Sequence, residues 1–157
     1  MQPEVPDFVD RFADHWAAVG GTRTEGLIAG YLLLDESEGV SAAELSQRLG
    51  VSRGSVSTYT RHLVERGFIR RVRLPGDRTH YFCMDQDVWA GFLRAEQDYL
   101  QRQHQLAQEM LGRVEPSGPA WQRLRNMRDY MQWVADNLAP EEWERFKTAR
   151  DARPEHG

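Results

Sequence analysis

The chain has 157 residues, a formal net charge of −4 and 40% hydrophobic content, enough apolar material for one ordinary packed core. Its longest apolar run, residues 27–34, is far shorter than the roughly 20 residues that cross a bilayer, and no basic-then-apolar leader opens the sequence. Cys83 is the one cysteine, which excludes an internal disulfide and a cysteine cluster for a metal. We expect a soluble cytoplasmic protein without a membrane partner, a metal site or a cofactor.

Positive charge is concentrated in one stretch. Residues 51–80 hold 7 arginines against two acidic side chains, whereas residues 1–50 carry a net charge of −6 and residues 81–157 a net charge of −3. A local excess of this kind predicts an anionic partner for that stretch. The acidic flanks should limit non-specific binding.

Two helices are predicted at the N-terminal end. Phe8, Phe12 and Trp16 recur at a spacing of four, which indicates a short amphipathic helix that ends at a glycine pair. Thr22 and Glu25 then have the spacing of a capping box, in which a hydroxyl and a carboxylate each cover a free backbone N–H. A largely buried second helix should follow through the apolar run.

The next pattern predicts two short helices joined by a tight turn. Ser41 and Glu44 form a second candidate capping box, and Gly50 ends the helix that follows. The fourth helix begins at Ser52, only a few residues later, and Gly67 ends it. Two helices connected so closely cross at a large angle.

Residues 68–84, "FIRRVRLPGDRTHYFCM", predict a β-hairpin. Two runs rich in β-branched and aromatic residues flank Pro75 and Gly76, which suit the central positions of a type II turn. Asp85 is the candidate cap of a long fifth helix to about Gly112. A sixth helix is expected to start near residue 119, and a final short one after residue 140.

The predicted fold is mainly α with a small β-hairpin wing, an α+β arrangement. Residues 22–84 would form a winged helix-turn-helix DNA-binding lobe, and residues 1–21 and 85–157 a helical dimerisation region. The fifth and sixth helices carry more apolar surface than one lobe can cover, and two linked half-sites about one helical turn apart on DNA raise affinity. Both observations favour a homodimer.

The fourth helix is built from poor helix formers, and groove binding explains them. With Val56, Thr60 and Leu63 turned to the core, its other face is small, polar and cationic. Small residues let the backbone approach the major-groove floor, hydroxyls bond phosphates or base edges, and arginine chelates guanine. Arginine at the hairpin tip suits a narrow minor groove. The candidate DNA-binding residues are Ser52, Arg53, Gly54, Ser55, Ser57, Thr58, Arg61, Arg73, Asp77 and Arg78, with Arg70 and Arg71 as further phosphate contacts.

Other functions were weighed against DNA reading. A winged helix can serve protein contacts alone, and Tyr59, at the border of the groove face, is compatible with that alternative. A constitutive architectural DNA binder is a third hypothesis. The sequence shows no phosphate-binding glycine loop, no nucleophile elbow and no metal-ligand spacing among its histidines, so we expect no enzyme. Cys83 is better explained by packing than by redox sensing.

Three segments resemble the MarR superfamily of bacterial regulators, and most closely its GbsR-like branch, which includes actinobacterial repressors of lipid-exporter and efflux genes. They are "GGTRTEGLIAGYLLL", "SAAELSQRLGVSRGSVSTYTRHLVERGFIRRV" and "PGDRTHYF". The resemblance covers about residues 7–112. It implies a homodimer that reads a pseudo-palindromic operator in double-stranded DNA, with repression relieved by a small molecule between the dimer helices and the DNA-binding lobe.

Two departures from that family pattern affect the fourth helix. Thr60 stands where an apolar residue is usual, and Tyr59 is bulkier than the usual small polar residue, so base preference is left open. All five tryptophans lie outside residues 41–80. Core and dimer packing is the default explanation of such aromatic residues, and an effector pocket for an apolar or amphipathic ligand is the other. The candidates for that pocket are Trp16, Tyr31, Trp89 and Phe92.

Overall fold

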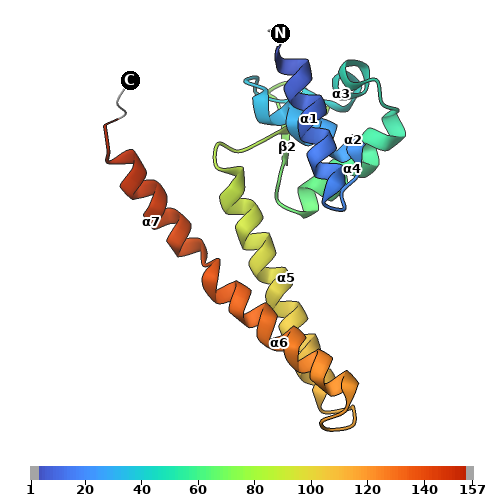
Figure 1. Cartoon of the computed structure of the whole chain (residues 1–157). Helices are drawn as coiled ribbons and strands as arrows, with labels where there is room; N and C mark the ends of the chain where they lie inside the picture. Colours follow the sequence, from blue (N-terminus) through green and yellow to red (C-terminus); the bar gives the residue numbers. More distant parts are fainter. Residues whose placement is uncertain (1–3, 155–157) are drawn as a thin grey trace. The chain divides into compact units, whose positions relative to one another are not determined.

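The computed structural model describes residues 4–154, and the chain forms two compact units that divide between Val88 and Trp89. The first unit contains α1 (Glu4–Ala18), α2 (Arg23–Leu34), β1 (Val40–Ser41), α3 (Ala42–Leu49), α4 (Arg53–Glu65), β2 (Arg70–Arg73) and β3 (His80–Cys83) (Figure 1). The second contains α6 (Pro119–Asn137), α7 (Pro140–Asp151) and all but the first residue of α5 (Val88–Leu111). This order confirms the mainly helical fold with a small β wing. Among the described helices, none has the length and apolar content needed to span a bilayer.

The predicted caps form in α3 and only in part in α2. Ser41 and Glu44 make both bonds of a capping box, with Glu44 N donating to Ser41 Oγ at 3.2 Å and Ser41 N donating to Glu44 Oε2 at 2.9 Å. Thr22 Oγ1 accepts from Glu25 N at 3.2 Å, but the Glu25 carboxylate is turned inward and accepts from Trp16 Nε1 at 3.0 Å. The prediction of a full capping box at α2 was therefore wrong, because the half-buried indole N–H of Trp16 takes the carboxylate instead.

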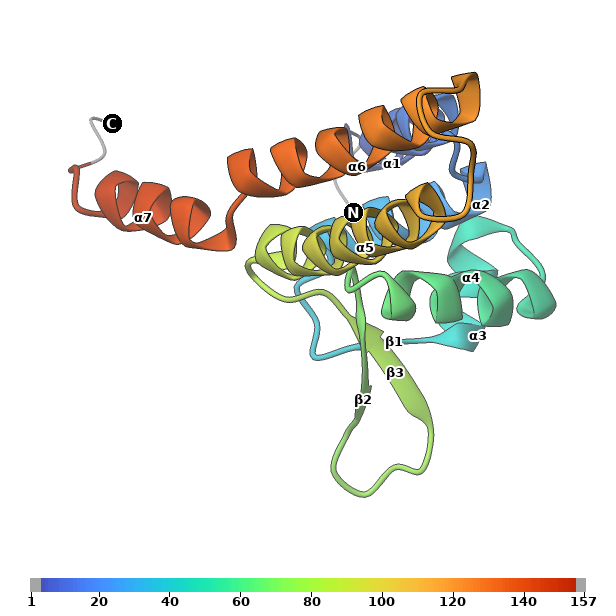
Figure 2. The same cartoon turned by 90° about the horizontal axis from the view of Figure 1, so that it is seen from below.

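The sheet has three antiparallel strands within the described residues, in the order β1-β3-β2. Strand β1 was not predicted from the sequence; its Val40 pairs with Phe82 of β3. The β2–β3 hairpin turns as predicted: Asp77 N donates to Leu74 O at 3.1 Å, and Gly76 has a φ of +76°. Figure 2 shows this hairpin, the wing, extending beyond the helices of its unit.

The inner face of α4 lies in the core of the first unit. Val56, Thr60 and Leu63 are fully buried there, as predicted, together with side chains of α2 and α3. Thr60, the one polar member, donates its hydroxyl to Val56 O at 2.6 Å, which satisfies the buried group within the helix itself. The remaining face of α4 is thereby directed outward.

Helix α1 packs closely on α2 through glycines. A Cβ at Gly26 would lie 2.7 Å from Ala13 Cα, and one at Gly30 would lie 3.1 Å from the Phe12 ring. Their missing side chains let the two helices approach. This packing places α1 in the first unit, and its part in dimerisation stays a prediction.

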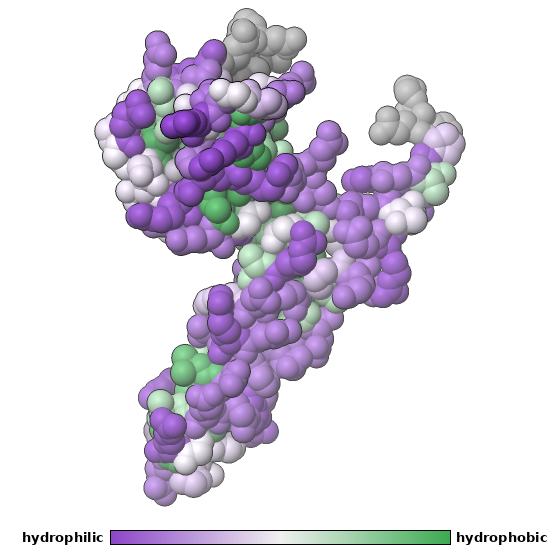
Figure 3. Space-filling model, turned by 180° about the vertical axis from the view of Figure 1, so that it is seen from behind, coloured by the Kyte–Doolittle hydropathy of each residue, from purple (hydrophilic) through white to green (hydrophobic). Residues whose placement is uncertain are grey.

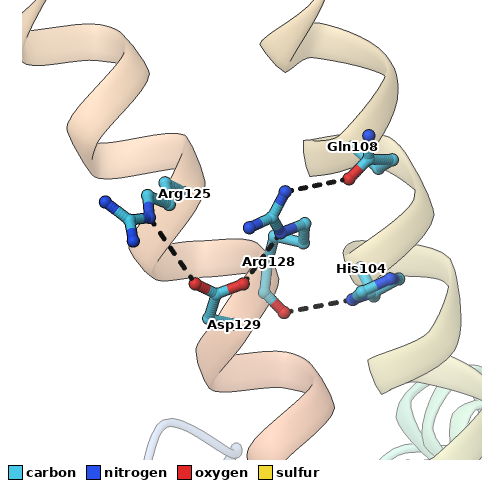
Figure 4. A network of polar contacts seen from close by, with 5 residues as sticks. All are labelled: His104, Gln108, Arg125, Arg128 and Asp129. Carbon is cyan, nitrogen blue, oxygen red and sulfur yellow. Dashed lines mark hydrogen bonds and ion pairs between the residues drawn. The ribbon is translucent and has the colours of Figure 1, made fainter. Parts of the chain in front are cut away.

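In the second unit, α5 and α6 form an antiparallel pair joined by polar side chains. Gln97 Nε2 of α5 donates to Ala135 O at 2.9 Å and to Leu138 O at 2.7 Å, which covers carbonyls at the end of α6. Figure 4 shows a second bridge, in which His104 Nδ1 lies 3.1 Å from Arg128 O and Arg128 Nη1 donates to Gln108 at 3.1 Å. Helices α6 and α7, both within the described residues, contain no buried residue.

The start of α5 differs from the prediction. Asp85 does not cap the helix, which begins three residues later at Val88. Its Oδ1 instead accepts from Arg70 Nε at 2.6 Å. The β2–β3 pairing brings Arg70 close to Asp85, so the carboxylate binds the guanidinium rather than backbone N–H groups of α5. That pairing cannot be predicted from the residues next to Asp85.

Candidate nucleic-acid interface

The first turn of α4 is capped by its own serines. Ser52 Oγ accepts from Ser55 N at 3.1 Å, and the two hydroxyl oxygens lie 2.9 Å apart. Ser52, the N-cap of α4, lies only two residues after Gly50, the C-cap of α3, which has a φ of +65°. Ser52 and Ser55 thus act first as structural groups that fix the start of the helix.

The outward face of α4 has the composition that was predicted for groove contact. Arg53, Gly54, Ser57 and Arg61 are exposed, and Thr58 is half-buried. A Cβ at Gly54 would meet only Ser52 Oγ, at 4.0 Å. No packing contact therefore calls for glycine at this position, although glycine costs a helix about 0.5–1 kcal/mol relative to alanine.

The arginines of residues 51–80 divide into two groups. Three are engaged: Arg66 Nη1 lies 3.8 Å from Glu25, Arg70 is held by Asp85, and the Arg71 guanidinium lies 6.0 Å from the centre of the Phe82 ring. The others enter no ion pair in the part of the chain that the structure describes; they are Arg53, Arg61, Arg73 and Arg78. Of the six arginines predicted to contact DNA, these four enter no ion pair among the described residues, whereas Arg70 and Arg71, the further phosphate contacts, are engaged within the protein.

Asp77 supports the wing tip rather than the neighbouring Arg78. Its Oδ1 accepts from Thr79 N at 2.8 Å, and its Oδ2 accepts from the Tyr81 hydroxyl at 2.6 Å. These bonds lower the pKa of Asp77, with the Tyr81 hydroxyl as the largest cause, and raise the pKa of Tyr81 above its ordinary value. Asp77 therefore closes the turn at the wing tip.

Between α4 and the wing lies a concavity of about 710 Å³. Arg53 and Ser57 line it from α4, while Arg71 and His80 line it from the wing. Residues 41–43, at the start of α3, complete it. His80 and residues 42–43 were not predicted as site residues, because their approach to α4 depends on the register of the three-stranded sheet.

The four aromatic residues predicted for an effector pocket fall into two groups. Trp16 packs edge-on against Phe68, with ring centres 4.9 Å apart, and Tyr31 is half-buried, which raises the pKa of its hydroxyl. Trp89 and Phe92 line a cavity of about 430 Å³ that lies wholly in the second unit. The structure thus brings two of the four together in one cavity.

Two further residues singled out in the sequence have ordinary surroundings. Cys83 is a half-buried free thiol, and the Tyr59 ring lies edge-on to His62 with centres 5.8 Å apart. Across residues 4–154, no three His, Cys, Asp or Glu side chains gather into a group that could hold a metal ion.

A tight helix-turn-helix followed by a hairpin, with unpaired arginines on both, defines a winged-helix DNA-binding regulator. The MarR family profile matches residues 22–78, and the profile of MmpR5-like MarR family transcriptional regulators matches residues 87–149. HTH-type transcriptional regulator MmpR5 from Mycobacterium tuberculosis is 31% identical over 134 residues, which cover 85% of this chain and 81% of that protein. The chain belongs to the MarR family of transcriptional regulators and, like the relatives it matches, is a regulator rather than an enzyme.

One solved structure has the same fold over nearly the whole chain. A crystal structure of a transcriptional regulator is 28% identical, covers 93% of this chain and 99% of its own, and superposes with a TM-score of 0.84. The heme sensor protein PefR, in complex with heme and carbon monoxide, is 18% identical over 88% of this chain and 89% of its own, with a TM-score of 0.39. The second likeness is too low to carry any inference about this chain.

Proposed function

We propose that the protein is a homodimeric repressor, acting in the cytoplasm, that binds a pseudo-palindromic operator and is released by a small apolar or amphipathic ligand. Within the MarR family we place it in the GbsR-like branch, on the three motifs quoted above. The observation that carries the proposal is the set of four unpaired arginines on α4 and the wing. These four arginines belong to residues 51–80, where seven arginines stand against two acidic side chains, and such a local excess of positive charge favours an external anion.

The contacts divide by their position on the unit. Arg53, Ser57 and Arg61, on the outward face of α4, are assigned to base edges and phosphates of the major groove. Arg78, at the wing tip closed by Asp77, is assigned to the minor groove, and Arg73 on the wing stem to a phosphate. Base contacts supply specificity, while the phosphate contacts supply affinity and salt dependence.

A second copy would cover the exposed apolar surface of the second unit. Large hydrophobic side chains are left at the surface of α5, α6 and α7. Those outside the aromatic cavity are Tyr99, Leu106, Met110, Tyr130, Trp133 and Phe146. A two-fold partner presenting the same face would bury them. Figure 3 shows one face of the molecule, which is mostly hydrophilic with scattered hydrophobic residues.

Ligand release requires only modest coupling. A difference of about 1–3 kcal/mol in ligand affinity between the DNA-bound and free forms would change operator occupancy about 5- to 150-fold. The aromatic cavity in the second unit supports a site of suitable size for such a ligand.

Selection of genomic fragments by the purified protein tests the proposal, together with sedimentation to determine the oligomeric state. We expect a short inverted repeat and a dimer. Recovery of fragments without a common sequence would favour the architectural alternative. Affinity for duplex DNA weaker than about 10 µM at modest salt, within the non-specific range, would favour a winged helix that contacts proteins.

A further inference from the structure

We propose that the cavity at the junction of α5, α6 and α7 is a binding site for a cationic amphiphile, a molecule with an aromatic or aliphatic body and one positive charge. The existence of this site is argued from the residues that line the cavity. Its role in releasing DNA rests on the proposed function.

The cavity is lined by apolar side chains from three helices. Trp89, Phe92 and Leu93 line it from the first turns of α5, and Leu138 and Trp143 line it from the corner where α6 ends and α7 begins. Its volume of about 430 Å³ falls in the range of sites for drug-sized ligands, about 300–1,000 Å³. Such walls favour a ligand with an apolar body of comparable size.

The corner itself is held by a polar clamp. Gln97 of α5 donates its two side-chain hydrogen bonds to Ala135 O and Leu138 O, at the C-terminal end of α6. Pro140 then begins α7 at its first position. This clamp fixes the two walls of the cavity relative to each other, so the site is formed without a ligand.

Charge at the corner favours a cation over an anion. Glu142 is the one charged residue among those lining the cavity. The three segments that supply the walls, residues 88–97, 134–139 and 140–147, together hold five acidic and three basic side chains. An anionic ligand would therefore meet a carboxylate and no lining cation, whereas a cation would meet a compensating charge.

The charged side chains next to the cavity do not remove its preference for a cationic ligand. Glu142 pairs with Arg145 along α7, but both side chains are mostly exposed, and an exposed pair of this kind exchanges readily with another cation. Lys147 Nζ lies 5.7 Å from the centre of the Trp143 ring and is itself paired with Glu144 at 2.9 Å. The Trp143 ring thus already holds a cation, an interaction that a ligand ammonium can also make with the aromatic walls.

A direct chain connection links this site to the wing. Only residues 84–87 separate the end of β3 from the start of α5, and Asp85 within them is held by Arg70 of β2. A ligand that tilts the first turns of α5 therefore acts on a short, anchored connection to the wing. This is the route by which occupancy would reach the DNA-binding surface.

Two ions of nearly equal shape and opposite charge test the site: tetraphenylphosphonium and tetraphenylborate, each titrated calorimetrically into the full-length protein. We expect Glu142→Gln to weaken binding of the phosphonium about fivefold, the upper range for an exposed ion pair, and not to weaken binding of the borate. Glu141→Gln removes a neighbouring charge that does not line the cavity and is the matched control, expected to leave both affinities unchanged.

A second pair of variants tests the aromatic wall. Trp143→Leu should weaken phosphonium binding about tenfold, and Trp121→Leu, at an α6 tryptophan that does not line the cavity, should not. Circular dichroism melting verifies folding, and the two glutamate variants decide the question if Trp143→Leu does not fold. Equal losses in both glutamate variants, or no binding of phosphonium to the wild type, would overturn the proposal.

Operator binding measured with and without tetraphenylphosphonium separates the site from its regulatory role. Weaker operator binding in the presence of the phosphonium, abolished by Glu142→Gln, is the result expected for a repressor. If the protein selects no operator, the proposed function fails, while calorimetry still decides whether the cavity binds the cation.

Discussion

Replacing Gly54 with alanine should make the protein more stable and a poorer DNA binder. The added methyl would find only Ser52 Oγ, at 4.0 Å, so it fits the free protein without strain. Alanine in place of glycine stabilises a helix by about 0.5–1 kcal/mol, and the lower figure suits a residue in the first turn of α4. For a unit of this size that free energy raises Tm by about 2–4 °C.

The same methyl points out from the face assigned to the major groove. If the α4 backbone contacts the groove floor at Gly54, one extra carbon must push the helix outward, at a cost similar to overpacking a core, about 1–3 kcal/mol. Operator affinity should then fall about 5- to 150-fold. Fluorescence anisotropy with labelled operator measures the affinity, and differential scanning calorimetry measures Tm.

Gly112→Ala is the matched control, because its Cβ would also meet nothing closer than 3.8 Å and it lies outside the winged-helix unit. It should leave operator affinity unchanged. If Gly54→Ala binds operator as tightly as the control does, glycine is not needed at this position for the α4 backbone to approach the groove floor.

Three further predictions follow from the contacts. Gly26→Ala should destabilise the protein by about 1–3 kcal/mol in urea unfolding, because its methyl would overlap α1, and an unchanged midpoint would refute that packing. Arg73→Ala should reduce the salt dependence of operator binding by about one phosphate contact. Arg70→Ala, which removes an arginine held by the Asp85 carboxylate, should reduce it less. If both variants show the same slope of log affinity against log salt concentration, the separation of the arginines into engaged and DNA-contacting residues is wrong. Hydrogen bonding lowers the pKa of Asp77 and raises that of Tyr81, so NMR relaxation should find the wing tip fully ordered between their ordinary values of 3.8 and 10.0. Order should fall in acid as pH drops through the lowered pKa of Asp77 and in base as pH rises through the raised pKa of Tyr81, and Tyr81→Phe should abolish the alkaline change.

The helices were predictable because their signals are local. The capping box at Ser41, the left-handed Gly50 and the buried spacing of Val56, Thr60 and Leu63 all lie within a few residues of the element they define. The turn at Gly76 is of the same kind. Local hydrogen bonding and periodicity therefore sufficed for the winged helix.

Contacts between distant residues could not be predicted in this way. Asp85 looked like a helix cap until the hairpin placed Arg70 beside it, and Glu25 looked like half of a capping box until α1 brought an indole N–H to it. Strand β1 is two residues long and is defined by its pairing with β3, in which Val40 lies opposite Phe82 and Ser41 opposite Tyr81. For the candidate site, composition identified the arginines, but which of them are left unpaired depends on tertiary structure.

Sequencing of the DNA fragments selected by the wild type and by Ser57→Ala and Arg53→Ala tests the central claim, that the outward face of α4 reads DNA bases. The account predicts an inverted repeat for the wild type, with altered base preference at one position of each half-site in the variants. The same preferred sequence from all three proteins, or no preferred sequence from the wild type, would contradict it.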